Sequence, residues 1–535
     1  MAQPSLFVRW LRTTALLITL MGAGAVAFFL LHGRRGQVDA LFRMLPADTG
    51  NVVVVQHLDA LLTALNHAVE SPDGPQELKD LQHDVRTRSV AQLGFDATRP
   101  EGWQKAGVDL GGAFALASSG KPDDPFAFSY LPVSDPTAAA ALFKRSLSNA
   151  GATVEDDEGN GLHVFRVRWP SNVDNEPYPP RAFAFQGGYA IVVGATGKAD
   201  AETALRKQLA GHGLGSEQSF RAVRAAVGEP WIAFAYASPA LVKQQLAAQQ
   251  AESSIGPAAG GGVGGALELS DEKLELRVRA LSEGTPLPVP LTEPHPTNDH
   301  VSGVEPLLAG RISMDPKAVV ARMKMDPAGQ EDLANAHDAL APLGVDFEKD
   351  LVPALDGQLT LGLVAPEKNE TSLVDLVAVV GAKDAPVLLK KLAPSLLPLG
   401  FLPGNDGWLS GPGMEVGATN DAFLLLGASP TRRAAWKKAV AAGGPPLWAA
   451  LPTEPRQSFE HGPALYAWAD LERAAEIVAH SGAPGSVQGA RVLRAMQSAS
   501  LGLDARDGII RLDADLYPPA GGFSRAFSNS PDAGR

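Results

Sequence analysis

The sequence predicts an α+β protein: an N-terminal transmembrane helix followed by two related domains, each a mostly antiparallel sheet with helices on one face. Three observations predict this fold class. A charge-free apolar stretch stands near the N-terminus, pairs of strands alternate with helices along the rest of the chain, and the same series of landmarks occurs twice. A chain of 535 residues also exceeds what one hydrophobic core usually organises, which favours more than one domain.

The apolar stretch runs from Thr13 to Leu31, with Arg12 before it and Arg34 and Arg35 after it. As a helix it would be about 28 Å long, close to the hydrocarbon thickness of a bilayer. We therefore predict a single-pass signal anchor with span limits Thr13 and Leu31, and the lipid bilayer as a partner of residues 13–31. The alternative is a cleavable signal peptide, because Ala25–Ala27 has the small-x-small pattern of a cleavage site.

The orientation of this predicted anchor follows from its flanks. Basic residues on both sides nearly cancel the positive-inside bias. A short N-terminal tail before a large C-terminal body is usual for an anchor whose tail lies in the cytoplasm. Together with an alanine-rich, lysine-poor composition, this predicts a bacterial inner-membrane protein with a periplasmic body.

The chain after the anchor is predicted as strands and helices that follow one another in a regular order. Val52–Val55 is a β-branched run and predicts a buried strand. Asp135 and Pro136 predict the N-cap and the first position of a helix. Further strands are predicted over 112–118, 126–133, 162–168, 181–185, 189–193, 231–237, 266–269 and 274–280, and helices over 58–69, 136–148, 199–209 and 239–250. Because most strands are followed by strands, the sheets should be antiparallel.

The second half of the chain repeats the landmarks of the first half in the same order. Gly107-Val-Asp109 before a strand matches Gly344-Val-Asp346 before a strand, and the strand pair that ends at Ala280 matches the pair that ends at Leu516. This predicts a tandem duplication. The predicted segments are the tail and anchor over 1–36, repeat 1 over 45–283, a proline-rich linker over 284–306, repeat 2 over 307–518, and a flexible tail over 519–535.

Composition and motifs exclude several functions. The net charge is −13 and no basic stripe occurs, which argues against nucleic-acid binding. The absence of Cys excludes disulfides, thiolate catalysis and Cys-ligated metals. Gly260–Gly265 fits G-x-G-x-x-G but precedes a strand instead of opening a helix, and is interpreted as a turn. Ser118-x-x-Lys121 lacks the partner motifs of serine–lysine enzymes. His295, Asp299 and His300 lie in the linker, where no rigid frame would hold a metal.

The segment from Leu45 to Leu61 contains Leu-Pro-Ala-Asp-Thr, a strand and His-Leu-Asp-Ala-Leu at a helix start. It resembles a group of uncharacterised bacterial envelope proteins with an N-terminal membrane span and a duplicated α+β ectodomain. The resemblance implies an architecture and no activity.

The predicted function is that of a non-enzymatic binding or scaffold protein of the cell envelope, with another envelope protein or a cell-envelope component as its partner. No catalytic, cofactor-binding or metal-binding residue is predicted, and no cofactor. The alternative is an envelope hydrolase or transferase that uses carboxylates in an interdomain cleft, because folding can bring acidic residues together from anywhere in a sequence. The oligomeric state is left open.

Overall fold

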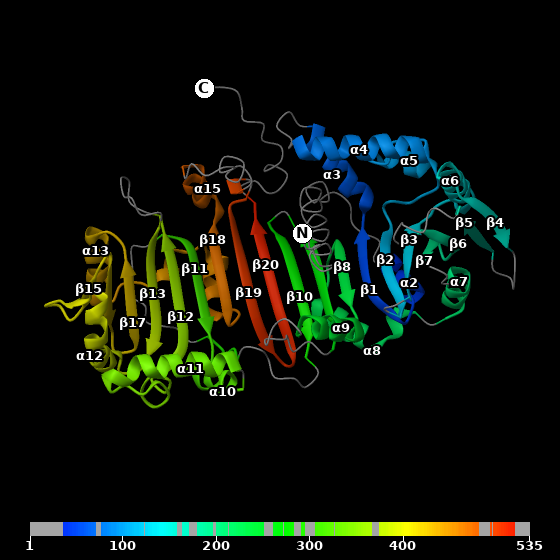
Figure 1. Cartoon of the computed structure of the whole chain (residues 1–535). Coiled ribbons are helices and arrows are strands. Elements are labelled where there is room, and N and C mark those ends of the chain that lie inside the picture. Colours follow the sequence, from blue (N-terminus) through cyan, green and yellow to red (C-terminus); the bar gives the residue numbers. More distant parts are fainter. Residues whose placement is uncertain are drawn as a thin grey trace, which may run out of the picture. The chain divides into compact units, whose positions relative to one another are not determined.

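A computed structural model describes residues 36–70, 76–121, 124–157, 163–170, 179–195, 200–211, 213–250, 261–270, 272–282, 290–294, 305–325, 327–365, 374–480, 493–494 and 496–518 (Figure 1). These residues form two compact units. Unit 1 holds the elements from α2 to β10, and unit 2 holds the elements from β11 to β20.

The predicted fold class is wrong on two points. No helix of the described residues is long and apolar enough to cross a membrane; the longest, α4 (Gln76–Leu93), carries charged residues along its length. Within the described residues this finding contradicts the interpretation as a transmembrane signal-anchor protein; the predicted span itself, Thr13–Leu31, lies outside them.

The second point concerns the helices, which cover both faces of the sheet in unit 1. Val164 on β5 (Val164–Arg168) and Ala182 on β6 (Pro180–Gln186) face the main core. Their neighbours Phe165 and Phe183 face the opposite way and pack against α6 (Pro136–Asn149). Because these strands are apolar on both faces, each face requires a helical cover.

Unit 1 contains ten strands in the spatial order β10-β9-β8-β1-β2-β3-β7-β6-β5-β4. Its strands not yet given are β1 (Thr49–Gln56), β2 (Ala113–Lys121), β3 (Asp124–Pro132), β4 (Thr153–Asp157), β7 (Tyr189–Ala195), β8 (Ala233–Ala237), β9 (Val263–Leu269) and β10 (Leu274–Leu281). Its helices not yet given are α2 (Gly36–Met44), α3 (Leu58–Glu70), α5 (Pro100–Lys105), α7 (Ala201–Ala210), η3 (Leu214–Ser216), α8 (Gln218–Val227) and α9 (Pro239–Gln250).

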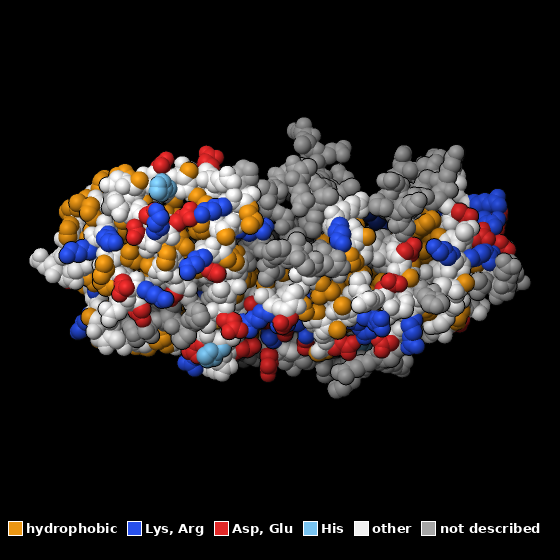
Figure 2. Space-filling view, turned by 90° about the horizontal axis from the view of Figure 1, so that it is seen from below, with side chains coloured by type: hydrophobic (Ala, Val, Ile, Leu, Met, Phe, Trp, Pro, Cys, Tyr) orange, Lys and Arg blue, Asp and Glu red, His pale blue; other side chains and the backbone are white. Residues whose placement is uncertain are grey.

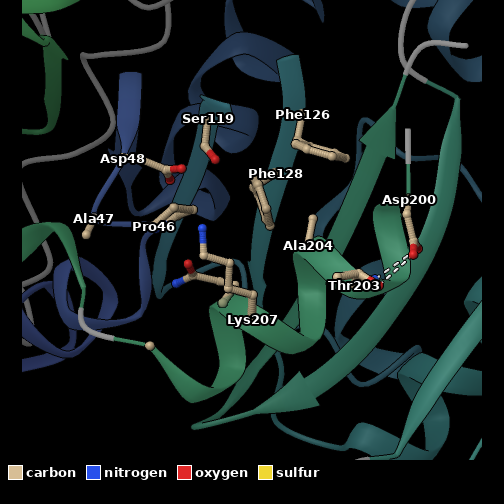
Figure 3. A pocket seen from close by; sticks show the side chains of 12 residues that line it. Pro46, Ala47, Asp48, Ser119, Phe126, Phe128, Asp200, Thr203, Ala204 and Lys207 are labelled. Atoms are coloured by element: carbon tan, nitrogen blue, oxygen red, sulfur yellow. Dashed lines mark hydrogen bonds between the residues drawn. The ribbon is translucent and has the colours of Figure 1, made fainter. Parts of the chain in front are cut away.

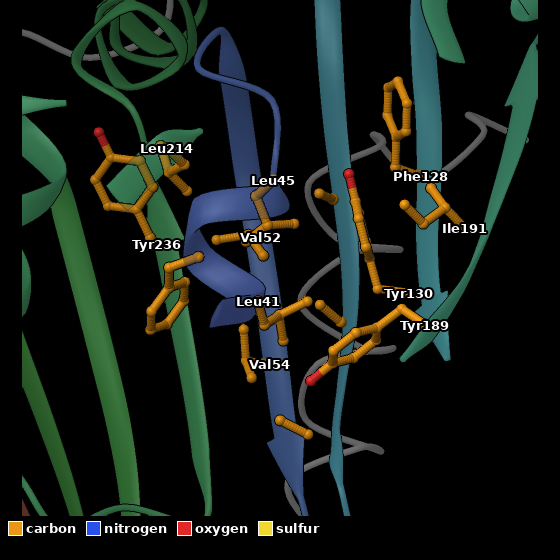
Figure 4. Close-up of a cluster of buried hydrophobic side chains, with 14 of the residues drawn as sticks. Leu41, Leu45, Val52, Val54, Phe128, Tyr130, Tyr189, Ile191, Leu214 and Tyr236 are labelled. Carbon is orange, nitrogen blue, oxygen red and sulfur yellow. The ribbon is translucent and has the colours of Figure 1, made fainter. Parts of the chain in front are cut away.

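The main core of unit 1 lies between one face of this sheet and the helices α2, α7 and α8 (Figure 4). Leu41 and Leu45 of the α2 region are completely buried and lie over Val52 and Val54 of β1. The strand predicted from the β-branched run Val52–Val55 is therefore confirmed as part of β1. Alternate residues of the run, Val52 and Val54, face α2. Burial of these side chains is the main source of stability for the unit.

Unit 2 repeats the strand order of unit 1, with each strand number raised by ten: β20-β19-β18-β11-β12-β13-β17-β16-β15-β14. The strands are β11 (Pro306–Ser313), β12 (Leu355–Val364), β13 (Asp375–Ala382), β14 (Leu402–Pro403), β15 (Leu409–Gly411), β16 (Met414–Ala418), β17 (Ala422–Gly427), β18 (Leu465–Asp470), β19 (Ser498–Arg506) and β20 (Ile509–Tyr517). The helices are α10 (Pro316–Met323), α11 (Pro327–Leu340), η4 (Ala341–Leu343), η5 (Phe347–Leu351), α12 (Ala385–Leu396), η6 (Leu397–Leu399), α13 (Pro430–Ala441), η7 (Leu447–Ala450), α14 (Thr453–His461) and α15 (Leu471–His480).

Several local predictions are confirmed, and several helices were missed, among them α2, α4, α5 and α8 in unit 1. Asp135 caps α6 by accepting hydrogen bonds from the backbone N–H groups of Thr137 at 2.9 Å and Ala138 at 3.1 Å. Helix α4 was not predicted, because its apolar residues do not form one stripe; Val85 and Val90 remain exposed. The predicted segment limits and the common ancestry of the two repeats stay predictions.

Candidate functional site

A cavity of about 480 Å³ opens in unit 1 between helix α7 and the sheet (Figure 3). Its lining comes from three places in the chain: the segment between α2 and β1, the strands β2 and β3, and one face of α7. The lining residues are Pro46, Ala47, Asp48, Ser119, Phe126, Phe128, Asp200, Thr203, Ala204, Lys207, Gln208 and Gly211.

Helix α7 presents its lining residues because they recur at helical spacing. Asp200, Thr203, Ala204 and Lys207 stand three or four residues apart and therefore share one face. The intervening Leu205 is fully buried in the core and holds the helix against the sheet.

The start of α7 is set by a side-chain cap. The carboxylate of Asp200 accepts hydrogen bonds from the Thr203 backbone N–H at 3.0 Å and from the Thr203 hydroxyl at 2.5 Å. These hydrogen bonds to Thr203 hold the pKa of Asp200 below its ordinary value. Asp200 is therefore an ionised capping group and is not placed to act as a general acid.

The floor of the cavity is aromatic. Phe126 and Phe128 are two residues apart on β3, so both rings lie on the same face of the sheet, with ring centroids 6.5 Å apart. The neighbouring Tyr130 donates a hydrogen bond from its hydroxyl to the Met44 carbonyl at 3.0 Å, and Gln208 donates to the same carbonyl. These bonds fix the end of α2, and with it the wall at Pro46, against β3 and α7.

The mouth of the cavity carries charge. Lys207 extends from α7 toward Asp48 and Ser119 (Figure 3), and Lys207 and Asp48 are exposed. Neither Lys207 nor Asp48 forms an ion pair with any residue that the structure describes. The site thus combines a hydrophobic floor with an ammonium group, a carboxylate and a hydroxyl at its opening.

The lining of this cavity is suited to binding a ligand and does not form a catalytic site. Its lining includes one Ser and no His, so the hydroxyl of Ser119 has no imidazole base beside it. Within the described parts of the chain, no group of three or more His, Asp or Glu side chains could hold a metal ion.

Of the residues singled out by sequence, only Pro46, Ala47 and Asp48 of the Leu45–Thr49 motif line this cavity. Thr13 and Leu31, Gly260, and His295 with Asp299 and His300 lie outside the described residues. Val263, Gly264 and Gly265 lie in β9, so the interpretation of the Gly260–Gly265 run as a turn is wrong for these three residues; Gly262 precedes the strand with a positive φ of 99°. Ser118 lies on β2 and donates a hydrogen bond to the Asn51 side-chain oxygen at 2.7 Å.

Sequence reasoning predicted a site role for none of the residues that line the cavity, including Pro46, Ala47 and Asp48, which it named only as part of a motif. The spacing of Asp200, Thr203, Ala204 and Lys207 marks one helix face, but mixed polarity at such positions is also typical of a solvated helix. The helix face is seen to border a cavity only because Pro46 and the aromatic residues of β3 lie opposite it in the tertiary structure.

Comparisons with known proteins add little to this geometry. No protein-family model and no curated protein matches the chain. Among solved structures, the chain is similar to crystal form I of TP0453, with a TM-score of 0.25 and 8% identity, over 46% of this chain and 80% of that chain. It is similar to crystal form III of TP0453 with a TM-score of 0.27 and 7% identity, over 48% of this chain and 88% of that chain. A likeness this weak carries no argument about the site, and the predicted resemblance to duplicated envelope proteins stays a prediction.

Proposed function

We propose that this chain is a non-enzymatic binding protein and that unit 1 binds a small amphipathic molecule in the cavity beside α7. One observation carries the proposal: an aromatic floor formed by Phe126 and Phe128 lies below an unpaired ammonium group at Lys207. An apolar body would displace water from the floor, while a polar or anionic head would meet Lys207 and the hydroxyl of Ser119.

The size of the cavity supports a small ligand. Its volume of about 480 Å³ lies within the range of small-molecule pockets. On the face drawn in Figure 2, Lys and Arg side chains are intermixed with Asp and Glu, an arrangement that does not favour a polyanion such as a nucleic acid.

The lining does not suit carboxylate-based hydrolysis at this cavity, while the alternative with carboxylates in an interdomain cleft stays a prediction. A carboxylate-based hydrolase needs one carboxyl group whose pKa is raised, so that it can donate a proton near neutral pH. Asp200 has a lowered pKa and is engaged with Thr203. The cavity therefore offers recognition without an acid–base pair.

The biological setting is a separate part of the proposal. The repeated strand order of the two units supports a tandem duplication, and a duplicated scaffold suits a binding protein with more than one surface. The periplasmic location and a partner among envelope proteins or cell-envelope components stay predictions.

The proposal is tested with 8-anilinonaphthalene-1-sulfonate, a fluorescent probe that joins an apolar ring system to an anionic head. We expect saturable binding to the full chain. Lys207→Glu places a negative charge at the mouth and should weaken binding at least tenfold, and Ala204→Trp should fill the cavity and abolish binding. Lys105→Glu, at an exposed lysine of α5, is the matched control and should bind as the wild type does. Unchanged binding by both cavity variants would refute the proposal.

A further inference from the structure

Unit 2 buries polar side chains at three sheet positions where unit 1 buries Val54, Ala115 and Ala113; a fourth buried polar residue, Ser313, corresponds to the half-buried Gln56 of unit 1. Arg311 lies two residues before the end of β11 and faces Thr360 on β12, and Ser313 at the end of β11 faces Gln358. Cross-strand partners project from the same face with Cβ atoms about 5 Å apart. These four residues, Arg311, Ser313, Gln358 and Thr360, are called the Arg311 cluster below.

The corresponding positions of unit 1 show what this part of the sheet holds when it serves only as core. Val54 lies two residues before the end of β1 and faces Ala115 on β2. Both are fully buried, and Leu41 of α2 lies over this part of the sheet (Figure 4). The same strand order therefore accommodates an apolar core here, and the polar residues of unit 2 are not required by the fold.

Each member of the Arg311 cluster is at least nine-tenths buried, and Arg311 itself is 3% exposed. Within the described residues, no hydrogen-bond partner is present for Arg311 Nε, for the hydroxyls of Ser313 and Thr360, or for either side-chain atom of Gln358. Arg311 donates one hydrogen bond from Nη2 to the Pro463 carbonyl at 2.9 Å and lies over the Phe459 ring at 5.3 Å. No described carboxylate forms an ion pair with it.

Arg311 carries its charge at neutral pH. Burial lowers the pKa of Arg311 to about 10, which is still well above 7. A buried charge without a counter-ion is strongly unfavourable, and so is a buried hydroxyl or amide without a partner. An anion beside Arg311 would relieve both penalties, because the guanidinium, the hydroxyls and the amide are all able to donate hydrogen bonds to it.

The neighbouring packing limits the size of that anion. A Cβ atom on Gly362, next along the same face of β12, would meet Leu447 Cδ2 at 2.7 Å. A Cβ atom on Gly502 of β19 would meet Pro463 Cγ at 2.7 Å. These contacts show that the surroundings are closely packed and have no room for a ligand with a bulky organic body.

We propose that the Arg311 cluster is a binding site for a small monovalent anion of the chloride class. The site is distinct from the cavity of unit 1, lies wholly within unit 2, and does not depend on the proposed function.

The test is thermal unfolding of the full chain in sodium chloride or sodium formate, against sodium gluconate at the same ionic strength, since gluconate is too large for the site. We expect the wild-type unfolding midpoint to rise with the logarithm of the chloride concentration once that concentration exceeds the dissociation constant. Arg311→Met should remove this rise, and Thr360→Val should shift the chloride concentration at which it begins upward several-fold. Arg221→Met, at an exposed arginine of α8, is the matched control and should respond as the wild type does.

Two results would overturn the proposal. One is a wild-type midpoint that is the same in chloride, formate and gluconate. The other is a dependence on chloride concentration in the Arg311→Met or Thr360→Val chain that coincides with that of the wild type, which would make the response a general salt effect. Chloride-35 NMR line broadening provides a direct readout: it should be present with the wild type and reduced with either cluster variant. If Arg311→Met does not fold, Thr360→Val decides the question alone.

Discussion

Truncation of Phe42 to alanine should remove a central contact of unit 1. Phe42 is 1% exposed and lies on α2, with its ring centroid 4.8 Å from that of Phe220, 5.8 Å from Phe234 and 6.4 Å from Trp231. Phe→Ala substitutions in cores cost about 3–5 kcal/mol, and each aromatic pair adds about 0.5–1.5 kcal/mol beyond area burial. These terms overlap, so we expect a loss of about 4 kcal/mol in the free energy of unfolding of unit 1.

The assay is urea unfolding of the full chain, followed by far-UV circular dichroism and by tryptophan fluorescence, with Trp231 as the nearby reporter. Because the chain has two compact units, each resolved transition is fitted separately. Leu116→Ala is the control: Leu116 is 47% exposed on β2, and its truncation should cost less than about 1 kcal/mol. A loss below about 1 kcal/mol for Phe42→Ala would show that α2 does not pack against the sheet in solution.

Two further predictions concern charge. Asp375→Asn should destabilise unit 2 by about 3–5 kcal/mol, because Asp375 is 1% exposed and its removal leaves Arg432 without its buried counter-ion. Urea unfolding measures this loss, and a paired Asp375→Leu, Arg432→Met variant should recover most of it; no recovery would contradict the assignment. Burial raises the pKa of Tyr189 and Tyr466 to about 12. The pKa of each tyrosine is higher in the folded state than in the unfolded state. The contribution of the protonated tyrosines to the free energy of unfolding is therefore complete below pH 10 and is lost as the pH rises from 10 to 12. Tyrosinate absorbance at 295 nm from these residues should therefore appear together with unfolding, and tyrosinate formation near pH 10 with the fold intact would contradict it.

The local elements were largely predictable because short stretches of sequence encode them. Asp135 followed by Pro136 gives a capping carboxylate and a fixed φ at adjacent positions, and α6 begins there. Val52–Val55 favours extended backbone whatever its surroundings, and it lies in β1. Helix α4 escaped prediction because charged residues along it leave no apolar stripe.

The candidate sites could not be predicted, because each one joins residues from distant parts of the chain. The cavity of unit 1 needs Pro46, Phe128 and Lys207 together, and nothing in their local patterns links them. In the sequence, Arg311 and Thr360 are each predicted only as strand residues. They form a cluster because β11 and β12 pair and place both side chains on one buried face. The sequence does not distinguish a buried arginine from an exposed one, because arginine also occurs on exposed strands, where its charge is solvated.

By itself, the sequence determined the secondary elements, the repetition of landmarks and the exclusion of cysteine chemistry, since propensity, capping and composition act over a few residues. It could not determine the order of the strands within each unit or that helices cover both faces of β5 and β6, because strand pairing and side-chain burial depend on residues far apart in the chain. Only the tertiary structure placed an aromatic floor below Lys207 and buried Arg311 among unpaired hydroxyls. Both arrangements arise from the meeting of separate strands and helices.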